Sequence, residues 1–196
     1  MQNSKSAAAY YERHLPHWQP EHRALFLTWR LHGSLPGGWT GSFLGEQTQS
    51  AGMTAGEQFR LADSRLDRTT SGPLWLRDPS VARCIAEAIW HGERELALYR
   101  LEAWVVMANH VHLLITPHAA LARITKSLKG FTARKANAIL GRTGKSFWQD
   151  ESFDHWVRHG AEFARIVSYI ERNPVTAGLV QRPEDWPWSS ASRQLG

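Results

Sequence analysis

Residues 109–115, Asn-His-Val-His-Leu-Leu-Ile, constrain the fold of this chain more than any other stretch. In an extended strand, residues two apart share a face, so His110 and His112 project to one side while Val111 and Leu113 project to the other. Two imidazoles side by side on a strand can bind a divalent metal ion. Two histidines that bind no metal on a half-buried strand explain this short pattern equally well, so other segments have to decide between the two interpretations.

The rest of the chain alternates between strand-like and helix-like patterns. Asp78 followed by Pro79 is typical of a helix N-terminus, and Ala108-Asn109 predicts a hairpin turn between two strands. We expect strands at 24–31, 96–107, 110–117 and 153–158, and helices at 57–66, 78–92, 119–140 and 161–172, the last ended by Asn173-Pro174. This order predicts an α+β fold in which one antiparallel sheet has its helices packed on one face.

The length of 196 residues fits one domain with additional segments. We expect an N-terminal arm at 1–22, a domain at 23–190 and a C-terminal tail at 191–196. The tract 33–72 begins with a run rich in Gly, Ser and Thr and is longer than a compact domain needs. It is interpreted as a loop-rich insertion, and the sequence assigns no role to it.

Composition excludes several classes of protein. The single cysteine, Cys84, rules out an intrachain disulfide and a zinc site built from cysteines. The first twenty residues lack the apolar run of a signal peptide, and the strongest apolar run, Trp104 to Ala108, is too short to cross a membrane. We therefore expect a soluble, cytoplasmic protein with no membrane partner.

Basic residues are concentrated in one part of the chain. The segment from His118 to Arg172 contains ten lysines and arginines against five acidic residues, which accounts for the whole formal net charge of +5. This favours a polyanionic partner such as nucleic acid, although a solvated helix face can have the same composition. In the helix at 119–140 we expect the inward residues to be Ile124, Leu128, Phe131 and Ile139. The candidates for contacts with a DNA backbone are Lys126, Lys129, Arg134, Lys135 and Arg158.

The final helix places a tyrosine at the border of its buried face. Its apolar stripe has the spacing i, i+3, i+4, i+7 and consists of Phe163, Ile166, Val167 and Ile170. At ~100° per residue, Tyr169 lies roughly 100° from the centre of that stripe, and Asn173 follows one turn later on the same flank. A boundary tyrosine that packs its ring and hydrates its hydroxyl is the simplest interpretation. A tyrosine beside a metal-binding histidine pair would also suit covalent cleavage of a phosphodiester.

Several longer motifs resemble one family. Residues 103–114, which include the two histidines, resemble the HUH motif of single-tyrosine transposases. Residues 168–180 resemble the tyrosine-helix signature of the REP-associated tyrosine transposases, and residues 147–158 and 186–190 resemble that group as well. The likeness extends over about residues 24–190. One departure is Ala108, which stands where the family usually has a proline.

This resemblance implies a ferredoxin/RRM-like HUH fold and a mechanism. In it, His110 and His112 bind Mg²⁺ or Mn²⁺, with Asn173 as a further ligand, and Tyr169 attacks a phosphate of single-stranded DNA. The products are a 5′-phosphotyrosine and a free 3′-hydroxyl. The family is associated with palindromic repeats that fold into hairpins, so the expected function is nicking and joining of single-stranded DNA beside a hairpin.

Two other functions are weighed against this one. A hairpin-DNA binding protein without cleavage activity is disfavoured because His110, His112 and Tyr169 are all intact. A metal-dependent hydrolase that activates water is disfavoured because two histidines and an amide form a poor water-activating set for zinc. The sequence shows no long exposed apolar face, which slightly favours a monomer.

Overall fold

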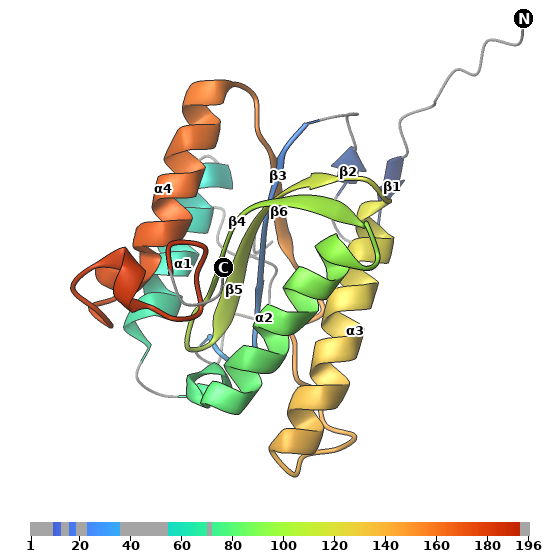
Figure 1. Ribbon diagram of the computed structural model, residues 1–196, viewed down its shortest axis with the longest axis vertical. Helices are drawn as coiled ribbons and strands as arrows, with labels where there is room; N and C mark the ends of the chain where they lie inside the picture. The colour runs from blue at the N-terminus through green and yellow to red at the C-terminus, as the bar shows by residue number, and fades with distance from the viewer. Residues whose placement is uncertain (1–9, 13–15, 19–22, 36–54, 70–71, 193–196) are drawn as a thin grey trace, which may run out of the picture.

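The computed structural model describes residues 10–12, 16–18, 23–35, 55–69 and 72–192 (Figure 1). Its main sheet consists of β3 (Leu25–Arg30), β4 (Tyr99–Val106), β5 (His110–Pro117) and β6 (Phe153–Trp156). The helices are α1 (Ala55–Arg68), α2 (Pro79–Arg94), α3 (Leu121–Ile139) and α4 (Gly160–Thr176), with the short 3-10 helices Trp75–Arg77 and Pro183–Asp185. Strands β1 (Tyr10–Glu12) and β2 (Pro16–Trp18) form a separate two-stranded sheet.

The main sheet has the order β4-β5-β3-β6, and all of its pairings are antiparallel. From β3 onward the α-helices and sheet strands follow the sequence β3-α1-α2-β4-β5-α3-β6-α4, and without the additional helices α1 and α4 this order is β3-α2-β4-β5-α3-β6. This is the β-α-β-β-α-β arrangement of ferredoxin-like folds. The predicted α+β class and antiparallel sheet are therefore confirmed.

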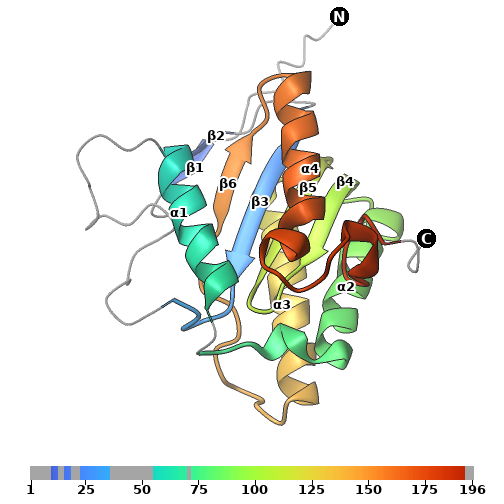
Figure 2. The same ribbon diagram turned by 90° about the vertical axis from the view of Figure 1, so that its left-hand side faces the viewer.

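The sheet is covered on both faces, not on one as the sequence predicted. Leu25, Leu27 and Trp29 pack with α2 and α3 in one core, whereas Phe26 and Leu114 pack with α1 and α4 in a second core. Figure 2 shows α1 and α4 in front of the sheet and α2 and α3 behind it. The physical reason is that all six residues of β3 are buried, so neither face of this strand is left to water.

The inward face of α3 differs from the prediction at two positions. Ile124 and Leu128 are buried as expected, but Phe131 and Ile139 are 43% and 45% exposed. Thr132 takes the inward place, and its hydroxyl accepts a hydrogen bond of 2.9 Å from the indole of Trp148. The buried stripe thus continues at four-residue intervals after Leu128 and leaves Phe131 outside.

Helix α4 does not end before Asn173-Pro174 but continues to Thr176. Proline at 174 removes only one helical N–H, and its side chain is buried. Gly178, which has φ of 70°, follows the end of the helix, and the amides of Gly178 and Leu179 donate to the carbonyls of Val175 and Pro174. Asn173 therefore remains inside the helix.

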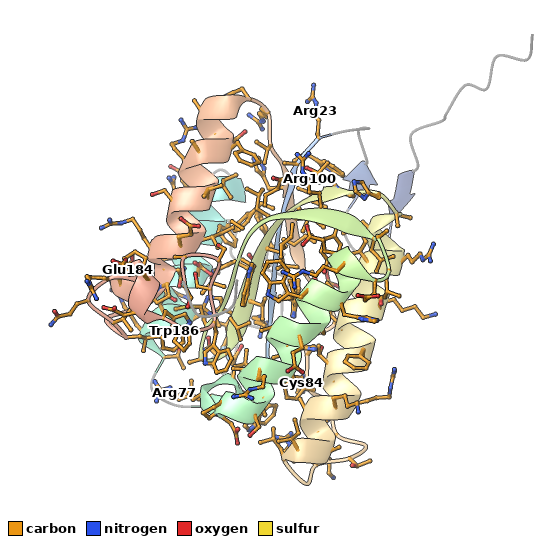
Figure 3. The ribbon with its side chains drawn as sticks, in the orientation of Figure 1. Arg23, Arg77, Cys84, Arg100, Glu184 and Trp186 are labelled. Carbon is orange, nitrogen blue, oxygen red and sulfur yellow. The ribbon has the colours of Figure 1, made fainter. Side chains whose placement is uncertain are left out.

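The C-terminal segment covers the edge of the sheet at β4. The amide of Val106 donates to the Trp188 carbonyl and the amide of Ser190 donates to the Trp104 carbonyl, both at 2.9 Å. The indole of Trp186, labelled in Figure 3, donates to the Val106 carbonyl at 3.0 Å. Residues 186–190 therefore protect an edge that would otherwise expose unpaired backbone groups.

Parts of three predicted segments lie outside the described residues. They are most of the N-terminal arm 1–22, residues 36–54 and 70–71 of the insertion, and residues 193–196 of the tail. Within the described part of the chain, no helix combines the length and apolar character that crossing a membrane requires.

Glycine at position 92 is required by close packing between α2 and β4. A Cβ at this position would lie 2.4 Å from the hydroxyl of Tyr99, which is buried and donates to the Ile89 carbonyl at 2.7 Å. We expect Gly92→Ala to lower the free energy of unfolding by about 1–3 kcal/mol. The control Gly130→Ala meets no atom closer than 3.6 Å and should raise it by roughly 0.5–1 kcal/mol, since alanine favours a helix. Urea unfolding measures both, and equal effects would contradict this interpretation.

Candidate metal centre and tyrosine site

The two histidines of β5 form a buried pair under α1 and α4. Both side chains are 0% exposed, and their Nε2 atoms lie 3.1 Å apart. They share one face of the strand, while Val111 and Leu113 pack in the opposite core, as the alternation predicts. Two Nε2 atoms that face each other at this distance are suited to bind one cation between them.

Each imidazole is held in place through its other nitrogen. His110 Nδ1 lies 2.7 Å from the amide oxygen of Asn109, whose Nδ2 donates to the Leu66 carbonyl at 3.0 Å. This fixes the orientation of the Asn109 amide, so its oxygen accepts a hydrogen bond from the N–H at His110 Nδ1. The other ring nitrogen, Nε2, then carries no proton and has a free lone pair. His112 Nδ1 lies 2.6 Å from the hydroxyl of Thr28, its partner across the strands. Such partners fix ring orientation in metal sites.

Burial keeps His110 uncharged. Burial first, and then the neighbouring His112, lower the pKa of His110 to about 3, although the carboxylate of Asp63 opposes the shift. A neutral imidazole is the form that binds a metal ion.

Helix α1 adds two carboxylates that the sequence analysis did not identify. Asp63 Oδ1 lies 3.3 Å from His112 Nε2 and 3.7 Å from His110 Nε2. Asp63, His110 and His112 can each direct one ligand atom to a common point. Asp67 Oδ1 also lies 3.7 Å from His110 Nε2. Both acids belong to the insertion 33–72, which therefore contributes directly to the site.

The two carboxyl groups differ in their ionisation. Burial raises the pKa of Asp63, but His112 and His110, together with a hydrogen bond from Asn173, lower it by more, so that it falls below its usual value. Burial and the negative charge of Asp63 raise the pKa of Asp67 to about 7. The two pKa values shift in opposite directions because both carboxyl groups are buried against the same histidine, so the negative charge of one disfavours ionisation of the other.

Helix α4 brings Tyr169 and Asn173 to the same place. The Tyr169 hydroxyl donates to Asp63 Oδ2, and its ring packs edge-on to His112 at 5.6 Å between centroids. The side chain is half-buried, as the helical spacing predicts. Asn173 is 1% exposed, and its amide nitrogen lies 3.4 Å from His112 Nε2. The structure thus brings together all four residues for which a catalytic or metal-binding role is predicted, and those roles remain predictions.

The donor set fits a hard divalent cation. Besides the imidazoles, it contains Asp63 Oδ1 and Asn173 Oδ1, which are buried and accept no hydrogen bond within the described part of the chain. Oxygen ligands with one or two imidazoles are suitable for Mg²⁺ or Mn²⁺.

The predicted DNA-contacting residues lie elsewhere. Lys126, Lys129, Arg134 and Lys135 belong to α3, which packs on the sheet face opposite Tyr169, and Arg158 precedes α4. Lys129 Nζ donates to the carbonyls of Gln149 and Asp150 and to the Ser152 hydroxyl, so it stabilises the loop after α3. The other four are exposed, and their contacts with DNA remain predictions.

Arg30 is a further basic residue that the sequence analysis did not identify. It pairs with His110 across β3 and β5, so it lies on the same sheet face, and it is only 3% exposed. Burial lowers its pKa to about 10, which still leaves it protonated at neutral pH. The alternation of Phe26, Thr28 and Arg30 in the first predicted strand was the signal that could have identified it.

Comparisons with known proteins show which family part of the chain is similar to. Residues 81–173 match the family described as "Transposase IS200 like", and this segment includes both histidines, Tyr169 and Asn173. The resemblance seen in the sequence motifs is therefore confirmed. Asp63 and Asp67 precede the matched segment.

The particular relatives are REP-associated tyrosine transposases. One from Escherichia coli (strain K12) is 28% identical over 101 residues, which are 50% of this chain and 57% of that protein. A relative from Haemophilus influenzae is 38% identical over 48 residues, 24% of this chain and 27% of that protein. The match therefore spans little more than half of the first relative. A solved structure of a REP-associated tyrosine transposase bound to a REP hairpin has the same fold, with a TM-score of 0.54 and 19% identity over 93% of this chain and 82% of that one.

The hydroxyl of Thr28 is expected to matter for metal binding although it is not itself a ligand. Thr28→Val keeps the shape of the side chain but removes the partner of His112 Nδ1, so the affinity for Mn²⁺ should fall roughly 10–100-fold. The control Thr125→Val removes a hydroxyl from α3 on the other sheet face and should leave the affinity unchanged. Isothermal titration calorimetry measures both, and an unchanged affinity for Thr28→Val would show that this contact does not orient a metal ligand.

Proposed function

We propose that this chain is a metal-dependent enzyme that nicks and joins single-stranded DNA through Tyr169. The observation that carries the proposal is the contact of the Tyr169 hydroxyl with Asp63, which itself contacts both histidines. A potential nucleophile thereby lies beside a group of residues suited to a divalent cation. Similarity to the IS200-like transposases supports the same assignment.

His110, His112, Asp63 and Asn173 would hold Mg²⁺ or Mn²⁺. When bound, the ion polarises the phosphoryl group and stabilises the departing 3′ oxygen. That help is needed because a tyrosine with an ordinary pKa pays about 4 kcal/mol to become a phenolate at pH 7. Arg30 supplies a fixed positive charge on the same face, which suits neutralisation of a phosphate.

The covalent step follows from the position of Tyr169. Its oxygen Oη forms a bond to phosphorus while the bond between phosphorus and O3′ breaks. The phenolic proton passes to Asp63 Oδ2, which accepts its hydrogen bond, and the 3′ oxygen takes a proton from solvent. The products are a 5′-phosphotyrosine and a 3′-hydroxyl, and attack by a 3′-hydroxyl on this linkage would rejoin DNA.

The proposed substrate is single-stranded DNA beside a hairpin formed by a palindromic repeat. The solved structure with the same fold is bound to a REP hairpin, and α3 presents basic side chains for the backbone of a stem. We further propose that the chain acts as a monomer, because Tyr169 contacts Asp63 and His112 of its own chain and one chain supplies the whole site.

Tyr169→Phe should abolish the covalent product while leaving DNA binding nearly intact. Wild type, incubated with labelled hairpin DNA carrying a single-stranded flank and Mn²⁺, should give a protein–DNA adduct on a denaturing gel, and EDTA should prevent it. The control Tyr99→Phe removes a buried tyrosine hydroxyl that donates to Ile89 in the core on the opposite sheet face, and should still form the adduct. Cleavage by Tyr169→Phe, or a wild type that binds the hairpin without forming an adduct, would contradict the proposal.

Lys126 and Lys135 should contribute to DNA affinity but not to the covalent step. Changing both to glutamine should reduce the slope of log affinity against log salt by about 1 for each lysine. The rate of adduct formation at saturating DNA should stay unchanged, since α3 lies on the other face of the sheet. The matched control Arg77→Gln/Arg182→Gln removes two exposed charges outside α3, of which Arg77 is labelled in Figure 3, and should leave the slope as in wild type. Filter binding over a range of salt concentrations measures it, and equal slopes for both double variants would contradict the assignment.

A further inference from the structure

We propose that Asp67 is a metal ligand, so that helix α1 supplies two carboxylates to the centre in addition to the histidine pair of β5 and the amide of α4. The proposal rests on the proposed function only in assuming a divalent cation at this site. It assigns a role to the insertion 33–72, which neither the motifs nor the matched family segment covers.

The first support is the placement of Asp67 relative to Asp63. The two residues are four apart on α1, so they lie on the same side of the helix, one turn from each other. Their Oδ1 atoms lie at the same distance, 3.7 Å, from His110 Nε2. The same side of α1 is fixed against the sheet by Phe59, Ala62 and Leu66, which are buried in the second core. The carboxylates therefore approach the histidines from a packed helix.

The second support is that several buried oxygen atoms of the site accept no hydrogen bond within the described part of the chain. Asp63 Oδ1, Asp67 Oδ1 and Asn173 Oδ1 are buried and accept no hydrogen bond from the described residues. No lysine or arginine in the described ranges forms an ion pair with either aspartate, and both instead lie against His110. Two adjacent carboxylates in an apolar layer are unfavourable unless a cation compensates them. A divalent ion would compensate both.

The third support is the number and kind of donors. Asp63, His110 and His112 bring their ligand atoms close together, and Asp67 Oδ1 adds a second carboxylate oxygen 3.7 Å from His110 Nε2. Mg²⁺ and Mn²⁺ prefer oxygen ligands, so the carboxylate of Asp67 would suit either ion as an additional donor from α1. The two carboxylates also balance the charge of the ion, which a set of two histidines and an amide does not.

Asp67→Asn should weaken Mn²⁺ binding by at least tenfold in calorimetric titrations of the full chain, because it replaces a charged ligand with a neutral one of the same shape. The control Glu57→Gln removes one negative charge from the exposed side of the same helix and should bind Mn²⁺ like wild type. Equal affinities for Asp67→Asn and wild type would overturn the proposal. Circular dichroism melting of each variant establishes that it is folded.

A second measurement needs no variant. In wild type, saturating Mn²⁺ should slow hydrogen exchange at the amides of residues 59–68, since the ion would tie α1 to β5 and α4. Unchanged exchange across α1 would overturn the proposal. Both results are separable from the proposed function: Asp67-dependent Mn²⁺ binding without any DNA adduct would contradict only the covalent mechanism, whereas an adduct with Asp67-independent Mn²⁺ binding would contradict only the role of Asp67.

Discussion

The structure depends on a polar cluster that is buried between the sheet and two helices. His110, His112 and Asp63 lie within an otherwise apolar layer that includes Phe26, Phe59 and Ile170. Burying such groups is unfavourable without partners, and three of the partners come from neighbouring segments. Thr28 on β3, Asn109 before β5 and Tyr169 on α4 each satisfy one of them. Packing and chemistry are therefore specified by the same contacts.

The sequence predicted the part of this arrangement that follows from periodicity. Alternation along β5 places the histidines on one face, and helical spacing places Tyr169 at the border of the buried stripe of α4. The order of strands and helices predicted the antiparallel sheet. What it did not predict is the covering of the second face, since an apolar β3 indicates burial without indicating which segment provides it.

The role of α1 was missed for a related reason. Phe59, Ala62 and Leu66 form the buried stripe of α1, and Asp63 and Asp67 lie on the same side of this helix. Acidic residues at i and i+4 within an apolar stripe are a signal, because an unpaired carboxylate is rarely buried. A single sequence could not show where the helix would dock, because its partners, Phe26 and Phe153, are far away in the chain. Similarly, the proline of α4 suggested an end to the helix, whereas tertiary packing carries the helix beyond it.

The two faces of the sheet have separate tasks. On one face, α2 and α3 bury an apolar core that fixes the register of β3 against β5, and with it the pairings of Thr28 with His112 and of Arg30 with His110. A shift of this register by one residue would turn both histidines into the α2–α3 core and remove them from Asp63 and Tyr169. The other face can therefore hold a cluster of buried polar contacts because the first holds the strands in place. The basic residues of α3 lie on the side of the α2–α3 core, so the charge proposed to attract DNA does not add positive potential beside the residues that would hold a cation.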